Sequence, residues 1–110
     1  MAINKIEIEI DTDVNHVPTG ISWSANDEKI TDRKAKAMIL AMWDEESGSL
    51  MNMDLWTKDM NVEEMRHFIC AVMMTLADTF ERATSDKAHA KAMRGFTKEL
   101  AERIGVLPKD

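Results

Sequence analysis

The sequence predicts an α+β protein in which a four-stranded antiparallel sheet is followed by two helices packed on one face of that sheet. Apolar and polar residues alternate in short runs as far as Thr57, whereas from Val62 on apolar residues recur every three to four positions. A change of period from 2 to 3.6 marks a change from strands to helices. Strands that all precede the helices favour an α+β order over an alternating one.

The first two predicted strands form a hairpin with a long loop. Isoleucine alternates with acidic residues over 6–10, which is typical of a half-buried strand with one solvent face. Asp, Asn, Pro and Gly are frequent in residues 11–20, as in turns, and the alternation resumes over 21–24. We expect residues 25–32 to form a polar turn.

The third and fourth strands are predicted over residues 34–43 and 50–57, joined by the short polar connection 44–49. The third segment is apolar on both parities, and such a strand is normally covered on both faces. Ala, Met and Leu favour helices, so a helix over 34–43 is the alternative. The strand is preferred because a partner of matching length follows and completes an antiparallel hairpin.

The helices have clear end signals. Asn61 and Glu64 form a capping box, and Met60 and Met65 are spaced for a hydrophobic staple. The first helix is predicted over 62–83, and its apolar stripe comprises Met65, Phe68, Ile69, Val72, Met73, Leu76 and Phe80. The second helix is predicted over 86–104, capped by Thr84 or Ser85 and ended by Gly105, with the stripe Ala92, Met93, Phe96, Leu100 and Ile104.

Length and charge limit the organisation and the partners. A chain of 110 residues with 45% hydrophobic residues fits one domain over 1–110, with its sheet at about 4–57. The net charge of −6 argues against nucleic acid, and no stretch approaches the length of a membrane span, so neither nucleic-acid binding nor membrane insertion is expected. One cysteine and a start without an apolar signal-peptide core predict a cytoplasmic protein.

The apolar excess of the third and fourth strands predicts an interface. Helices on one face of the sheet leave the other parity of the third strand exposed, and such a surface marks a contact site. Ten methionines are many for this length, and their flexible side chains suit adaptable contacts. We expect a homodimer or a higher oligomer. The candidate interface consists of Met38, Leu40, Met42, Met51 and Met53.

A chemically varied cluster, Asp54, Trp56 and Lys58, lies where the strands give way to the first helix. As a recognition patch, it would use Trp56 as an aromatic anchor. The structural interpretation is favoured: Trp56 packs, and Asp59 assists the helix start through the helix dipole. Recognition by this cluster is therefore the less favoured of the two interpretations, and the three residues are kept as a candidate recognition patch.

No residue pattern indicates an enzyme, a cofactor or a metal. Asp11, Asp13 and Asn15 have the spacing of a calcium loop, but His16 occupies the glycine position. Glu63, Glu64, His67 and Cys70 could hold a metal, but a di-iron site needs a second such motif. Cys70 beside His67 is interpreted as a packed thiol and not as a nucleophile, because it lies in mid-helix.

Several segments resemble the GldC family, the gliding motility-associated protein C of bacteria. The segment 54–60, reading Asp-Leu-Trp-Thr-Lys-Asp-Met, with Val62 and Glu64-Met65 after it, is the most specific part of this resemblance. Further agreement comes from Val17-Pro18, Ile21 to Ala25, Lys36-Ala37 to Trp43-Asp44, and Ala83-Thr84. The resemblance implies a non-enzymatic accessory protein that contacts an unidentified protein of the gliding machinery, with no catalytic or cofactor residues to carry over.

A second function is left open. Four antiparallel strands followed by two helices are also the order found in SecB-type export chaperones, a similarity of architecture alone. The alternative prediction is therefore a holdase-like chaperone that uses a Met-rich apolar surface.

Overall fold

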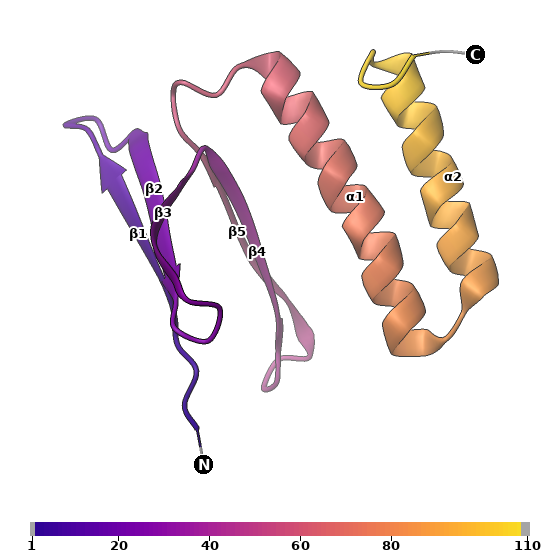
Figure 1. Cartoon of the computed structure of the whole chain (residues 1–110), viewed down its shortest axis with the longest axis horizontal. Coiled ribbons are helices and arrows are strands. Elements are labelled where there is room, and N and C mark those ends of the chain that lie inside the picture. The colour runs from indigo at the N-terminus through magenta and orange to yellow at the C-terminus, as the bar shows by residue number, and fades with distance from the viewer. Residues whose placement is uncertain (1, 109–110) are drawn as a thin grey trace. The chain divides into compact units, whose positions relative to one another are not determined.

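The computed structural model describes residues 2–108, which form two compact units divided between Met60 and Asn61. Each unit is described by itself. The first contains five strands, and the second contains two helices (Figure 1). The elements are β1 (Ile6–Thr12), β2 (Pro18–Ala25), β3 (Ile30–Ala35), β4 (Ala37–Asp44), β5 (Ser49–Trp56), α1 (Val62–Thr84) and α2 (Lys87–Arg103). The α+β class is confirmed, whereas the single domain and the helices packed on one sheet face stay predictions.

The prediction of one four-stranded sheet is wrong. The strands form a three-stranded antiparallel sheet in the order β1-β2-β3 and a separate two-stranded antiparallel sheet of β4 and β5. The strand predicted over 34–43 contains the end of β3 and most of β4, with a bend at Lys36 between them. The apolar run crosses this bend without interruption, which is why the sequence reads as one strand.

An irregularity in β3 explains why residues 30–32 were predicted as turn. The register between β2 and β3 shifts between Trp23 and Ala25, so that two residues of β3 lie across from Ser24. Asp32 has a φ of 48°, and its N–H donates to Ser24 Oγ over 3.0 Å. A bulge of this kind interrupts the alternation by which a strand is recognised.

The three-stranded sheet has one apolar and one polar face. Ile8 lies opposite Trp23, and Ile10 opposite Ile21. Residues paired across antiparallel strands share a face. The apolar face carries one charged residue, Arg33, and the apolar residues Ile6, Ile8, Ile10, Ile21, Trp23, Ala25, Ile30 and Ala35. The other face carries Glu7, Glu9, Asp11, Ser22, Ser24 and Lys34. Ile21, only 3% exposed, marks the core of this sheet.

The start of α1 is confirmed as a capping box. The Glu64 N–H donates to Asn61 Oδ1 over 2.7 Å, and the Asn61 N–H donates to Glu64 Oε1 over 3.1 Å. Both groups would otherwise be unpaired donors at the helix start. The predicted helix of 62–83 extends one residue further and ends at Ser85, which has a φ of 60°.

The prediction that Thr84 or Ser85 caps the second helix is wrong. The N-cap is Asp86, whose side chain accepts from the His89 N–H over 3.0 Å. Ser85 belongs to the end of α1 instead. The end of α2 follows the sequence, because Gly105 has a φ of 81° and the Val106 N–H reaches Ala101 O over 2.8 Å, which is a Schellman motif.

The fully buried residues of α1 and α2 are small and lie outside the predicted stripes, whose members are half-buried or exposed. Phe96 is 70% exposed, and Leu76 is exposed as well. Small side chains let two helices approach closely, which leaves bulkier ones outside the seam between the helices. The buried residues of the pair are Cys70, Ala77, Ala90, Thr97 and Ala101.

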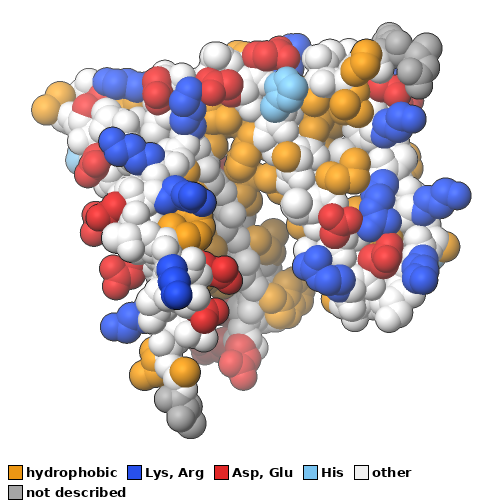
Figure 2. Space-filling view, in the orientation of Figure 1, with side chains coloured by type: hydrophobic (Ala, Val, Ile, Leu, Met, Phe, Trp, Pro, Cys, Tyr) orange, Lys and Arg blue, Asp and Glu red, His pale blue; other side chains and the backbone are white. Residues whose placement is uncertain are grey.

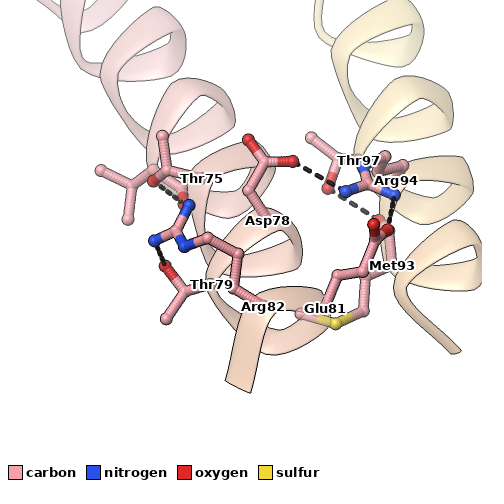
Figure 3. Close-up of polar contacts among 9 residues, drawn as sticks. Thr75, Asp78, Thr79, Glu81, Arg82, Met93, Arg94 and Thr97 are labelled. Atoms are coloured by element: carbon pink, nitrogen blue, oxygen red, sulfur yellow. Dashed lines mark hydrogen bonds and ion pairs between the residues drawn. The ribbon is translucent and has the colours of Figure 1, made fainter. Parts of the chain in front are cut away.

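Arg94 of α2 joins the two helices beside this seam. Its guanidinium nitrogens lie 2.8 Å from Asp78 Oδ1 and 2.9 Å from Glu81 Oε1, and Figure 3 shows it between these two residues of α1. The hydrogen bonds that Arg94 donates to Asp78 and Glu81 raise its pKa above the ordinary value. Asp78 and Glu81, which lie outside the predicted apolar stripe of α1, therefore contribute to the contact between the helices.

Candidate interaction surface

The pairing of β4 with β5 assigns each hairpin side chain to one of two faces. Met42 lies opposite Met51, Leu40 opposite Met53, and Met38 opposite Leu55. These six residues define the Met face of the hairpin. All five residues of the predicted interface lie on it. Leu55 was missed, although its parity with Met51 and Met53 could have revealed it.

The opposite face is aromatic and partly polar. Trp43 lies opposite Leu50, Ala41 opposite Asn52, Ile39 opposite Asp54, and Ala37 opposite Trp56. These eight residues define the Trp face. Asp54 and Trp56 of the predicted recognition patch lie here. The structure therefore places the predicted interface and most of the predicted patch on opposite faces of one ribbon.

Both faces are open to solvent. Met51 is 59% exposed on one face, and Trp43 is 74% and Trp56 53% exposed on the other. No residue of β4 or β5 is fully buried. Figure 2 shows charged side chains interspersed over β1–β3 and hydrophobic ones along β4 and β5. A two-stranded ribbon is marginally stable by itself in water, so this hairpin needs further contacts on its faces.

The segment after β5 ties the hairpin to the three-stranded sheet. The Thr57 N–H donates to Lys36 O over 2.8 Å, and the Lys58 N–H donates to Pro18 O over 3.2 Å. Thr57 is buried, and its hydroxyl donates to the Asp59 carboxylate. This hydrogen bond lowers the pKa of Asp59 below its ordinary value. The backbone of Thr57 and Lys58 therefore has a structural role.

Lys58, the third residue of the predicted patch, points elsewhere. Its Nζ lies 3.5 Å from Asp13 Oδ2 in the loop between β1 and β2. Asp13 also accepts from the Val17 and Asn15 N–H groups, and these bonds lower the pKa of its carboxyl. The predicted patch is thus only partly assembled, because Lys58 contacts a loop while Asp54 and Trp56 lie on the Trp face.

Two of the hollows in the first unit include residues of the hairpin or of the segments that flank it. A polar one of about 550 Å³ is lined by residues that include Asp11, Gly20, Lys34, Lys36 and Asp59. An apolar groove of about 230 Å³ is lined by Ile6, Ile8, Ile21, Trp23, Ala35, Ala37 and Met38. The groove extends the apolar surface from the three-stranded sheet to the first residues of β4. Sequence reasoning missed both hollows, because each combines residues distant in the chain.

The residues weighed as metal ligands have other roles. Asp13 orders its own loop through the Asn15 and Val17 N–H groups, Glu64 caps α1, and Cys70 is buried. Glu63 Oε1 and His67 Nε2 are 3.5 Å apart on the exposed surface of α1. Within residues 2–108, no group of three or more His, Cys, Asp or Glu side chains could hold a metal ion.

The fold and this surface define a small α+β protein with an exposed, apolar β-hairpin. The chain belongs to the GldC-like family: the family model described as gliding motility-associated protein GldC-like matches residues 18–106. The match includes both hairpin faces and both helices and begins at β2, so β1 lies outside it. The family connects the chain with gliding motility. Comparisons with curated proteins and with solved structures gave no significant match. Neither described helix is sufficiently long and apolar to cross a membrane.

Proposed function

We propose that this protein is a non-enzymatic accessory protein of gliding motility that acts through protein contacts, with the β4–β5 hairpin as its contact element. The observation that carries the proposal is the Met face, on which three successive cross-strand pairs are apolar and the pair at the turn, Asp44 and Ser49, is polar. The proposal includes a cytoplasmic location, in keeping with an acidic chain that has one cysteine. It requires neither a metal nor a cofactor.

The exposed area of the hairpin is sufficient for such contacts. Seven of its large apolar side chains are between 42% and 74% exposed: Ile39, Met42, Trp43, Leu50, Met51, Met53 and Trp56. At about 200 Å² for each fully exposed side chain, they offer roughly 800 Å². The two faces together therefore offer about the area that one partner buries in a standard protein interface.

The Met face suits a second copy of the chain. Interfaces of permanent oligomers are more apolar than those of transient complexes and resemble a protein core. A twofold axis would place the same flexible methionines against one another, and such side chains adapt to each other without needing polar partners. We therefore propose that the Met face forms a homodimer.

The test compares two neighbouring lysine substitutions. Met51→Lys places a charge on the Met face, whereas Asn52→Lys places the same charge on the Trp face. Sedimentation velocity is expected to show a dimer for the wild type and for Asn52→Lys, and a monomer for Met51→Lys with an unchanged circular dichroism spectrum. A monomeric wild type at high concentration would overturn the dimer, as would equal behaviour of the two variants.

A holdase-like chaperone is the second candidate. The apolar groove that includes Ile8, Trp23 and Met38 favours it, since this groove offers apolar surface beyond the Met face. The protein would then suppress the aggregation of reduced insulin at stoichiometric amounts, and Met51→Lys would reduce the suppression. Light scattering of insulin that rises equally with and without the protein would exclude this activity.

A further inference from the structure

The Trp face differs chemically from the Met face, and the difference points to another kind of partner. Two exposed tryptophans lie at its ends, because Trp56 belongs to the first of four cross-strand pairs and Trp43 to the last. Pairs that share a face recur every two residues, so the tryptophans are roughly 20 Å apart along the strands. Between them are the polar side chains Asn52 and Asp54. Exposed tryptophans around a polar group are typical of binding hot spots.

The charge of the hairpin has one sign. Residues 37–57 contain Asp44, Glu45, Glu46 and Asp54 but no Lys, Arg or His. Asp44 accepts from the Ser47 N–H over 2.8 Å at the turn. Within residues 2–108, by contrast, no cation pairs with Asp54, which is exposed in the middle of β5. The surface therefore complements a basic partner.

The edge of β5 favours an extended partner segment. In the two-stranded sheet, β5 has β4 as its one hydrogen-bonded neighbour. The Thr57 N–H to Lys36 O bond makes these two residues a hydrogen-bonded pair, so by alternation the backbone groups of Asn52, Asp54 and Trp56 point away from β4. No Lys or Pro protects this edge. Added strands commonly bind at such edges, with alternate side chains over one face.

We infer that the Trp face and the adjacent β5 edge bind an extended segment of a partner protein in which Arg residues alternate with apolar ones. An Arg guanidinium can form a bidentate pair with Asp54 and stack on the neighbouring Trp56. Because successive side chains of a strand point to opposite faces, the apolar side chains of the segment would then lie beside Met51, Met53 and Leu55 at the same edge. The inference rests on the proposed function and specifies the chemistry of the partner.

The experiment uses the full-length protein and two synthetic peptides of alternating Arg-Val and Glu-Val residues. Isothermal titration calorimetry is expected to detect binding of the Arg-Val peptide alone. Asp54→Asn should weaken this binding at least about tenfold, the loss expected for a charge-assisted hydrogen bond. Glu9→Gln removes the same charge from the polar face of the three-stranded sheet and should change the affinity less than about twofold.

Asn52→Lys provides a second, independent variant. A cation beside Asp54 on the same face should repel the Arg-Val peptide and weaken its binding. The same variant is expected to remain a dimer, because residue 52 lies outside the Met face. Equal losses for Asp54→Asn and Glu9→Gln would show that the peptide responds to net charge and would overturn the inference. Equal binding of the two peptides would overturn it as well. Dimerisation without peptide binding would leave the proposed function standing and reject this partner alone.

Discussion

The three-stranded sheet and the β4–β5 hairpin are built from the same antiparallel pairing, yet they expose opposite kinds of surface. In β1 every second residue from Glu7 is acidic, and Ser22 and Lys34 continue this polar face across the sheet. In β4 and β5 the charged residues are Asp44 and Asp54, one in each strand. The parity of a few side chains therefore decides whether a sheet has one charged face or two faces that are both largely apolar.

Burial follows the same division. The three-stranded sheet buries Ile21 and Ala25, whereas every residue of the hairpin keeps some exposure. The first sheet thus contributes to a core within the chain. The hairpin has apolar side chains in excess of what its own unit buries, which is the property expected of an element that contacts other molecules.

The largest expected effect is on the core of the three-stranded sheet. Ile21→Ala should lower the free energy of unfolding by about 2–5 kcal/mol, because it removes buried methyl groups and leaves a cavity. Met51→Ala should cost less than about 1 kcal/mol in dilute protein, because Met51 is already more than half exposed. Urea denaturation, carried out at low and at high protein concentration, measures both losses of unfolding free energy. If the two variants lose the same unfolding free energy at every protein concentration, the two sheets do not differ in this way.

The connection between the sheets should have an intermediate effect. Thr57→Val keeps the shape of a buried side chain but removes the hydroxyl that donates to Asp59. It should therefore lower the free energy of unfolding by about 1 kcal/mol. The pKa of Asp59, followed by carboxyl NMR, should rise towards its ordinary value. Thr19→Val is the control, since the Thr19 hydroxyl bonds Asp11 O at an exposed site and its loss should matter less. An unshifted Asp59 pKa would contradict the assigned role of Thr57.

Making the hairpin resemble its neighbour should have a small effect on stability. Trp43→Lys places a charge on the Trp face at a side chain that is 74% exposed. It should change the unfolding free energy by no more than about 0.5 kcal/mol, while binding of a hydrophobic dye falls. Trp23→Lys, the same change on the apolar face of the three-stranded sheet, should be clearly destabilising. If thermal melts show a similar loss of stability for both variants, Trp43 is packed against other residues and is not an exposed side chain.

Acid should have the smallest effect, and it acts on the turns of both sheets. Hydrogen bonds from Val17 and Asn15 N–H groups lower the pKa of Asp13, and bonds from Ser47 lower that of Asp44, each from an ordinary value of 3.8. A lowered folded-state pKa contributes stability that is present above the unfolded value and is lost as the pH falls through the folded one. The melting temperature should therefore decline below about pH 4, and less so in Asp13→Asn and Asp44→Asn.

Much of the local structure could be predicted from the sequence. The capping box of Asn61 and Glu64 and the end of α2 at Gly105 form as expected, because each needs residues only a few positions apart. The parity of the hairpin also follows from the sequence, since Met38, Leu40 and Met42 must share a face in any strand. The candidate interface could therefore be assembled before the structure, although its use as an interface stays a prediction.

The rest depends on contacts between distant residues. Membership of a sheet is set by hydrogen bonds to another strand, so the division at Lys36 leaves no mark in the apolar pattern. The bulge at Asp32 hides β3 because it interrupts the alternation. The buried side of α2 is set by how closely α1 approaches, which favours Ala90 and Ala101 over the larger Phe96. The sequence by itself determined where most elements begin and which side chains share a strand face. The sequence also indicated the pairing of β1 with β2 and of β4 with β5. Only the tertiary structure decided how the strands divide into two sheets and which helix side is buried, because those choices depend on the fit between surfaces far apart in the chain.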